Sequence, residues 1–241
     1  MSAGVADVDE QDFYMNAFWA RYLGCSVDEL RPESALVLRH SGPMRDLVDQ
    51  GIFIFAAGGG PLVSLPPESY EKLTPQAERL SSNDIYDPDL LRSVFSALPV
   101  NRIVGPNFLG HADETMLSPK SGYPTRQLTN ADNTALKVFQ HAFTEPEWQD
   151  CGSEIEEGPV MGAFTDDGTL VSTAGYVAWA NKLAHITVAT HPEFRLKGFA
   201  RAVTGALVRL ALSNRLVPQY LALETNQPSI ALARALGFVK F

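Results

Sequence analysis

Three features are scarce in this sequence, and each scarcity narrows what the protein does. Cysteine occurs only at Cys25 and Cys151, far apart and without zinc-type spacing, so we expect neither a disulfide framework nor a metal site. Positive charge is scarce, because 19 Lys and Arg stand against 28 Asp and Glu. The formal net charge of -9 disfavours a nucleic-acid or anionic-membrane partner. No apolar run approaches the roughly 18 residues of a membrane span.

Targeting and catalytic signatures are missing as well. The first dozen residues have neither the basic nor the apolar segment of a signal peptide, so we expect a cytoplasmic protein. The sequence contains no G-x-x-x-x-G-K-[ST] loop, no G-x-S-x-G elbow and no H-E-x-x-H zinc motif. What is present is ordinary: 45% hydrophobic and 20% charged residues, as in a globular protein with a real core.

The N-terminal half gives weak signals. Residues 1–12 are small and acidic and predict a flexible tail, followed by an accessory lobe over 13–118. The run Gly58-Gly59-Gly60-Pro61 separates two apolar segments and therefore predicts a hairpin turn rather than a phosphate loop. A helix is expected over 11–23 and a strand over 101–104.

The C-terminal half gives clearer signals, after a turn-rich boundary at Leu117–Tyr123 that opens a second domain over 119–241. Asp166-Asp167-Gly168 between two apolar runs is a strong hairpin signal. Antiparallel strands then lead into a β-α-β crossover, which predicts an α+β fold. The expected elements are a helix over 130–143, strands over 160–164, 170–179, 184–189 and 220–223, and helices that begin at Gly198 and near Pro228.

The most informative segment is 186–200, where an apolar strand passes through a short turn into an amphipathic helix that begins at Gly198. Such a junction points several main-chain N–H groups at one spot beside the positive end of a helix. Gly198 lets the main chain approach a bulky phosphate, and Arg195 and Lys197 add positive charge. The segment predicts a phosphate or pyrophosphate site. The alternative is a loop that enters a helix, in which the glycine only relieves strain.

Two motifs give this segment a context. The pattern Val188-x-Thr190-x-Pro192-x-x-Arg195-x-x-Gly198-x-Ala200 resembles the acyl-CoA-binding signature of the GNAT (Gcn5-related N-acetyltransferase) superfamily. Downstream, Asn226-x-x-Ser229 and Leu236-Gly237-Phe238 resemble the last helix of that family, particularly of its FR47-like branch. The resemblance covers about residues 123–241.

The resemblance implies a fold, a co-substrate and a set of binding residues. The fold is a mixed, mostly antiparallel sheet flanked by helices, whose central strands 184–190 and 220–225 splay apart, with an N-terminal α/β lobe in addition. The co-substrate is acetyl-CoA, without a metal. Strand main-chain groups would pair with the pantetheine arm, and loop N–H groups would hold the pyrophosphate. The implied binding residues are Val188, Ala189, Thr190, Arg195, Leu196, Lys197, Gly198, Phe199, Ala200, Arg201, Asn226 and Ser229.

Catalysis is less well defined by the sequence. The reaction of this family is direct attack of an amine on a thioester, which needs a base, an oxyanion donor and an acid. His185 and Glu224 are the candidate bases, and a main-chain N–H near Val188 or Ala189 is the candidate oxyanion donor. Family members often carry a tyrosine acid where this sequence has Ala233, so Ser229 or water would have to act as the acid.

The sequence therefore predicts an N-acetyltransferase that moves an acetyl group from acetyl-CoA to a primary amine of a small molecule or peptide. The alternative is a non-catalytic acyl-CoA-binding or sensor protein, which the alanine at position 233 favours. The accessory lobe is either a degenerate copy of the same fold or a cap that shapes the acceptor site. Nucleic acid and membrane are not expected partners, and a homodimer stays open.

Overall fold

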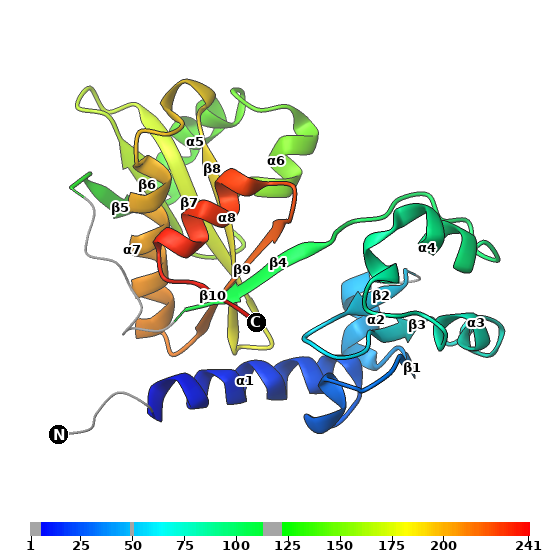
Figure 1. The fold of residues 1–241 in the computed structure, drawn as a ribbon. Helices are drawn as coiled ribbons and strands as arrows, with labels where there is room; N and C mark the ends of the chain where they lie inside the picture. The colour runs from blue at the N-terminus through cyan, green and yellow to red at the C-terminus, as the bar shows by residue number, and fades with distance from the viewer. Residues whose placement is uncertain (1–5, 49–50, 113–121) are drawn as a thin grey trace. The chain divides into compact units, whose positions relative to one another are not determined.

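A computed structural model describes residues 6–48, 51–112 and 122–241 (Figure 1). Its contacts divide the chain into two compact units, Met1–Pro106 and Asn107–Phe241. The division falls before the expected boundary at residue 118, because β4 (Asn107–His111) pairs with β9 (Val217–Leu223) and so belongs to the C-terminal unit. Most of the turn-rich stretch 117–123 lies outside the described residues.

The N-terminal unit has a small sheet with the strand order β1-β3-β2. Its β1 and β3 are parallel, whereas β2 and β3 form the antiparallel hairpin that the glycine run predicts. The elements are α1 (Ala6–Leu23), β1 (Leu36–Arg39), α2 (Gly42–Val48), β2 (Phe53–Phe55), β3 (Leu62–Leu65), α3 (Tyr70–Ala77) and α4 (Pro88–Val94), with 3₁₀ turns at Asp28–Leu30 and Asp84–Tyr86.

Two expectations for this unit differ from the structure. Helix α1 begins at Ala6, inside the segment that predicts a flexible tail. The strand expected over 101–104 is wrong, because this stretch is irregular and pairs with neither sheet. Its apolar residues serve different purposes: Ile103 packs against the core of the unit, whereas Val104 is 59% exposed.

The C-terminal unit is built on a seven-stranded sheet with the order β10-β4-β9-β8-β7-β6-β5. All neighbours are antiparallel except β8 and β9. Among the described residues, no helix is long and apolar enough to cross a membrane. The remaining elements are β5 (Thr125–Gln127), α5 (Asn133–Gln140), α6 (Glu145–Cys151), β6 (Val160–Phe164), β7 (Leu170–Trp179), β8 (Leu183–Thr190), α7 (Phe199–Ser213), α8 (Gln227–Ala235) and β10 (Val239–Lys240).

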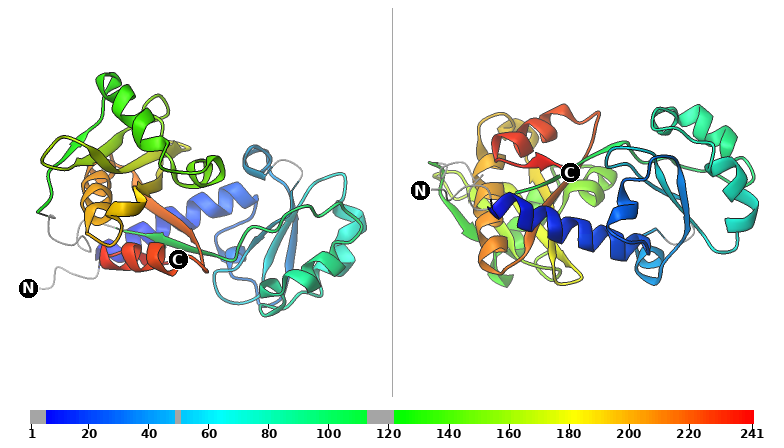
Figure 2. Two further views of the ribbon diagram at one scale, coloured as in Figure 1. Left: turned by 90° about the horizontal axis from the view of Figure 1, so that it is seen from above. Right: turned by 60° about the horizontal axis from the view of Figure 1, so that its bottom comes forward.

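Helices cover both faces of this sheet (Figures 1 and 2). Because side chains alternate along a strand, β8 contributes to two cores. Ala184 and Ile186 belong to the core that holds the apolar residues of α7 and α8. Ala189 belongs to the other core, with Leu136 of α5 and Trp148 of α6. The fold is thus the expected mixed α+β arrangement with a mostly antiparallel sheet flanked by helices.

The parallel pairing of β8 and β9 is short. It runs from Leu183 opposite Val217 to Ile186 opposite Tyr220, and β8 continues beyond Ile186 to Thr190 without β9 as a neighbour. Strand β9 likewise continues to Leu223, paired only with β4. The two central strands therefore separate from Ile186 and Tyr220 onward, as the resemblance implies.

The helix expected over 130–143 corresponds to a 3₁₀ turn and α5, and a further helix that was not expected, α6, follows it. A 3₁₀ turn at Asn130–Asp132 leads into α5, and α6 begins afresh at Glu145. A capping box causes the second start: the Thr144 N–H donates to Glu147 Oε2 at 3.0 Å, while the Glu147 N–H donates to Thr144 Oγ1. Pro146 is tolerated in the first turn, where its missing N–H costs nothing.

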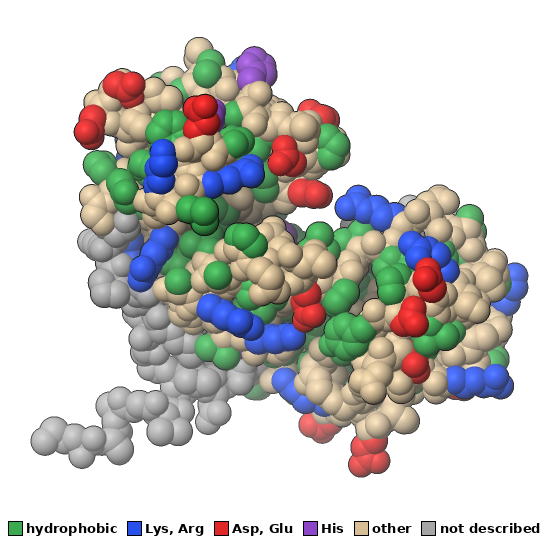
Figure 3. All heavy atoms as spheres, turned by 45° about the horizontal axis from the view of Figure 1, so that its top comes forward, with side chains coloured by type: hydrophobic (Ala, Val, Ile, Leu, Met, Phe, Trp, Pro, Cys, Tyr) green, Lys and Arg blue, Asp and Glu red, His purple; other side chains and the backbone are tan. Residues whose placement is uncertain are grey.

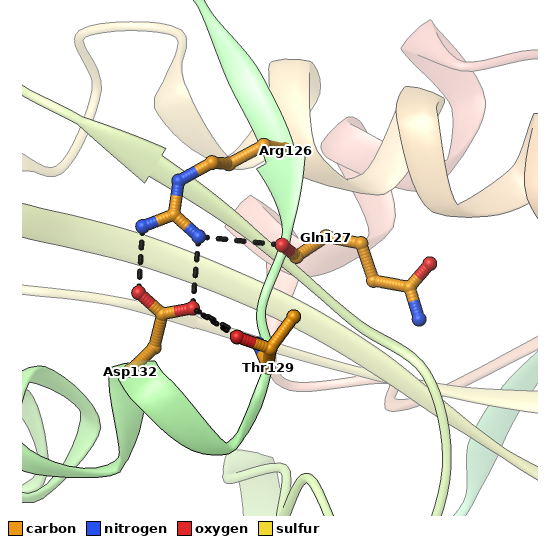
Figure 4. Close-up of polar contacts among 4 residues, drawn as sticks. All are labelled: Arg126, Gln127, Thr129 and Asp132. Carbon is orange, nitrogen blue, oxygen red and sulfur yellow. Dashed lines mark hydrogen bonds and ion pairs between the residues drawn. The ribbon is translucent and has the colours of Figure 1, made fainter.

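An ion pair fastens β5 to the 3₁₀ turn that leads into α5 (Figure 4). Arg126 of β5 donates to both carboxylate oxygens of Asp132, at 2.8 and 2.6 Å. The Thr129 N–H donates to the same carboxylate at 2.9 Å, so Asp132 also closes the turn that begins α5. The Arg126 guanidinium and the Thr129 N–H hold the pKa of Asp132 well below its usual range.

We expect Asp132→Asn to lower the free energy of unfolding by about 1–2 kcal/mol, because the bidentate pair and the cap both lose a charge. Urea denaturation at pH 7 measures the change. Asp166→Asn, at an exposed turn position of the same unit, is the matched control and stays within about 0.5 kcal/mol of the parent protein. Equal midpoints for the two variants would contradict this role of Asp132.

Candidate functional site

The main chain of β8 has two edges, one toward β7 and one toward β9. The ladder with β7 decides which residues face the gap that opens between β8 and β9. The His191 N–H donates to Val171 O at 3.0 Å, and the register places Ala189 opposite Thr173. In an antiparallel ladder, residues that exchange hydrogen bonds alternate with residues whose N–H and C=O point to the other edge. The main-chain groups of Ala189 therefore face β7, whereas those of Val188 and Thr190 face the gap beside β9.

This alternation separates the three predicted pantetheine-binding residues. Val188 and Thr190 present an N–H and a C=O at the open edge of β8, as an added strand would need. Arg195 Nε donates to Thr190 O at 3.2 Å, which shows independently that this carbonyl points away from β7. Ala189 instead supports the edge from inside the sheet.

The loop after β8 is a tight turn. His191 Nδ1 accepts the Glu193 N–H at 3.3 Å and so begins a 3₁₀ turn at Pro192–Phe194. Two residues then adopt the left-handed region, Leu196 with a φ of 61° and Gly198 with a φ of 92°. A leucine in this conformation is strained by about 1–2 kcal/mol, and its side chain is 99% exposed. The loop is thus shaped for its main chain rather than for its side chains.

Helix α7 starts directly after Gly198. The Ala202 N–H donates to Gly198 O at 3.1 Å, which closes the first turn of the helix. The N–H groups of Phe199, Ala200 and Arg201 precede it, and such groups at a helix start have no partner within their helix. Gly198 is needed here for a second reason: a Cβ would lie 3.2 Å from Tyr123 Cε2, whose ring rests on Phe199.

Basic side chains surround this loop. Arg195, Lys197 and Arg201 are exposed. Arg195 Nη2 also lies 3.9 Å from Glu147 Oε1 of α6, and Lys197 Nζ lies 4.9 Å from the centre of the Phe194 ring. Elsewhere the charges are mixed: on the face shown in Figure 3, acidic and basic side chains are interspersed without a large field of either sign. A local cationic loop is therefore compatible with the negative net charge.

The start of α8 brings Asn226 and Ser229, which are predicted site residues, together with Tyr220, which is not. Asn226 caps the helix, because its Oδ1 accepts the Ser229 N–H at 3.2 Å. The Ser229 hydroxyl lies 2.9 Å from the hydroxyl of Tyr220 on β9. Ala233 is fully buried one turn further along. The structure thus places Asn226 and Ser229 beside β9, and adds a tyrosine that the sequence reasoning did not single out.

The candidate base His185 lies in the closed part of the sheet. It is opposite Gln219 in the paired part of β8 and β9, and Gln219 Nε2 lies 3.4 Å from its Nδ1. The ring stacks on Trp179 with the ring centres 4.2 Å apart. Burial lowers the pKa of His185 to about 4, so the ring is neutral at pH 7 and a weak base.

The candidate base Glu224 already has a cationic partner. Its carboxylate accepts a hydrogen bond from Lys240 Nζ at 3.1 Å, and its main-chain O accepts one from the side chain of Gln227. Glu224 follows the end of β9 at Leu223, whereas His185 lies opposite Gln219 further back along that strand. Both assignments stay predictions, and the surroundings of both side chains weigh against them.

Cys151 has the environment of an unreactive thiol. Burial, followed by the charge of Glu147, raises its pKa to about 11. The thiolate required of a nucleophile is therefore rare at neutral pH. The neighbouring Trp148 is buried in the core and donates to Glu154 Oε1 at 3.0 Å, which makes it an anchor of α6.

Comparisons with known proteins point to one superfamily. Residues 127–240, just under half of the chain, match the family model described as GNAT acetyltransferase. No curated protein matches the sequence. Among solved structures, an acetyltransferase of the GNAT family from Colwellia psychrerythraea is 16% identical, covers 74% of this chain and 72% of its own, and has a TM-score of 0.51.

Two other solved structures share less of the chain. A GNAT-family protein from Novosphingobium aromaticivorans DSM 12444 is 26% identical over 59% of this chain and 64% of its own, with a TM-score of 0.49. A Salmonella typhimurium protein solved with its cofactor acetyl-CoA is 21% identical over 48% of this chain and 79% of its own, with a TM-score of 0.40. This chain thus spans less than two thirds of the Novosphingobium protein.

The comparisons support the GNAT superfamily for the C-terminal unit. The family model covers both motifs that carry the resemblance, and the Colwellia structure supports the fold. The FR47-like branch stays a prediction. The binding residues also stay predictions, now with defined positions in the structure.

We expect His185 to make the protein sensitive to mild acid. Its pKa is about 4 in the folded protein and about 6.5 when unfolded, so the unfolded state takes up the proton first as the pH falls. Stability is therefore lost between about pH 6.5 and 4. His185→Gln should reduce the loss between pH 7 and 4.5 by on the order of 2 kcal/mol, measured by urea denaturation at both pH values.

His141→Gln, at an exposed position of the same unit, is the control and keeps the pH dependence of the parent protein. If His185→Gln kept it too, the ring would not be the buried neutral group described above.

Proposed function

We propose, from the superfamily match of the C-terminal unit, that this protein is an acetyl-CoA-dependent N-acetyltransferase acting on a primary amine. The observation that carries the proposal is the continuity of one binding surface. The open edge of β8 at Val188 and Thr190 leads directly into the left-handed turn at Gly198 and the first N–H groups of α7. A ligand with an amide-bearing arm and a pyrophosphate has the groups that this surface would pair.

The residues present fit such a ligand. The N–H groups from Leu196 to Arg201 would hold the pyrophosphate, and Arg195 and Lys197 would balance its charge. The pantetheine amides would pair with the edge of β8 at Val188 and Thr190. Asn226 caps the start of α8, where Ser229 lies against Tyr220 of β9.

The chemistry follows from what these groups can donate. The amine nitrogen forms a bond to the thioester carbonyl carbon, and the carbonyl oxygen takes up negative charge. The Val188 N–H, which faces the gap, is the group that would hold this oxygen. When the carbon–sulfur bond breaks, the electron pair goes to sulfur, where Ser229 is the hydroxyl of α8 that can stabilise it.

The amine must also lose a proton. We propose that this proton leaves through water rather than through His185 or Glu224. A neutral imidazole with a pKa near 4 is a poor base at pH 7, and the Glu224 carboxylate is paired with Lys240. Net transfer converts an amine and a thioester into an amide and a thiol.

Ala233 supports a second candidate function, a non-catalytic acyl-CoA-binding or sensor protein. The two candidates share the binding surface and differ in turnover. Release of free CoA thiol from acetyl-CoA, measured across a panel of polyamines, aminoglycosides and peptides, separates them. We expect amine-dependent release for at least one class. Binding of acetyl-CoA without release from any amine would favour the sensor.

The cofactor site is tested by Gly198→Ala. A methyl group at this position meets Tyr123 and opposes the left-handed turn that presents the loop N–H groups. We expect the dissociation constant of acetyl-CoA, measured by calorimetry, to rise about tenfold or more.

The hairpin offers a matched control for this variant. Gly168 has nearly the same φ, 87°, and the position that a Cβ would occupy is open space. Gly168→Ala should cost a similar conformational strain of about 1 kcal/mol without changing the affinity for acetyl-CoA. Equal affinity in both variants would overturn the assignment of the loop.

A further inference from the structure

We propose that Tyr220 is a positioning residue that orients the Ser229 hydroxyl toward the sulfur of the bound thioester. This inference rests on the proposed function, because it concerns the sulfur of CoA. The buried Tyr220 of β9 thereby supplies a phenol to the site, although position 233 holds an alanine instead of a tyrosine.

The position of Tyr220 is defined by the end of the parallel ladder. Tyr220 lies opposite Ile186, the last pair before β8 and β9 separate. A pantetheine arm that starts at the Gly198 loop and follows the edge of β8 passes Thr190 and then Val188. It cannot pass Ile186, because there the edge is already paired with β9. The reactive end of the arm therefore stops beside Tyr220.

The side chain of Tyr220 points to the face of the sheet that α8 covers. It is 3% exposed and belongs to the same core as Ile230 and Ala233 of α8. Its ring meets Phe238 edge-on, with the ring centres 5.3 Å apart. These contacts fix the phenol oxygen, which lies 2.9 Å from Ser229 Oγ.

The acidity of the two hydroxyls sets the direction of their hydrogen bond. A phenol is far more acidic than an alcohol and is therefore the better donor, so Tyr220 donates and Ser229 accepts. Burial raises the pKa of Tyr220, which keeps its proton in place above neutral pH. The Ser229 hydroxyl has a single O–H hydrogen. Because its oxygen accepts the hydrogen bond from Tyr220, this hydrogen is free to be donated to another acceptor.

The sulfur at the end of the arm is that acceptor. As the carbon–sulfur bond breaks, the Ser229 O–H donates to the sulfur that receives the electron pair. The thiol finally keeps a proton equivalent to the one lost by the amine and carried by water, so Ser229 and Tyr220 end each turnover unchanged. Without Tyr220, the Ser229 hydroxyl can rotate among its rotamers and donate elsewhere.

Two ligands that differ only at sulfur test this arrangement. CoA and desulfo-CoA are titrated calorimetrically into the parent protein, Tyr220→Phe, Ser229→Ala and the double variant, at pH 7 and pH 9. A larger fraction of a thiol is ionised at pH 9 than at pH 7, and a hydrogen bond to a charged group is the stronger kind. We expect the parent protein to prefer CoA over desulfo-CoA by about tenfold at pH 9 and less at pH 7.

Both single variants should lose most of this preference, and the double variant should lose no more than either. Tyr176→Phe is the matched control, because it removes another buried tyrosine hydroxyl of the same unit, which bonds Asn214 at 2.9 Å. This control should keep the preference. With an amine substrate, Tyr220→Phe should lower kcat about tenfold while KM for acetyl-CoA stays within about twofold.

The outcomes separate the two proposals. If the parent protein binds CoA and desulfo-CoA equally at pH 9, or if Tyr220→Phe keeps the preference, the role of Tyr220 is overturned and the proposed function stands. An equal loss of the preference for CoA in Tyr176→Phe would also overturn it, because the loss would then be a general effect of removing a buried hydroxyl from the core. If neither ligand binds the parent protein, the proposed function fails first.

Discussion

The candidate site depends on one constraint, the early end of the hydrogen-bonded ladder between β8 and β9. Four residue pairs join the strands, from Leu183 and Val217 to Ile186 and Tyr220. Beyond them β8 keeps its partner on one edge only. Main-chain groups that lose a strand neighbour must find another partner, because an unpaired polar edge is costly when covered. An extended ligand with amide groups is such a partner. The gap between the two strands is closed at one end, where the ladder stops, and open at the other.

The closed end gives the gap a direction. At the open end, the chain turns through Leu196 and Gly198 into α7, so the N–H groups proposed to bind the anion and the open edge share one entrance. Anion binding there relies on main-chain dipoles, which do not depend on the net charge of the protein. This explains how a chain with a formal net charge of -9 can present a phosphate site. Alternation along β8 then selects Val188 rather than Ala189 as the residue that faces the ligand.

Local patterns predicted the C-terminal unit well, because its signals act over few residues. The glycine turn at 166–168 and the start of a helix near Pro228 are set by neighbouring residues, and the structure has both. Helix α6 was not predicted, although Thr144 and Glu147 are a local sign of its start. Other features were missed because they depend on distant partners. The partners of Glu224 and Tyr220 become visible only in the folded chain, where β10 joins the sheet beyond β4 and α8 packs on β9.

The core explains why the tyrosine at this site comes from a strand rather than from the last helix. Ala233 is fully buried in the cluster that also contains Tyr220 and Phe238. Closely packed interiors leave no room for a second large ring, so a tyrosine at position 233 would compete with the one at 220 for the same core. A small residue on α8 and a large one on β9 fill that volume together. The phenol then reaches Ser229 from the sheet, where the paired strands hold it firmly.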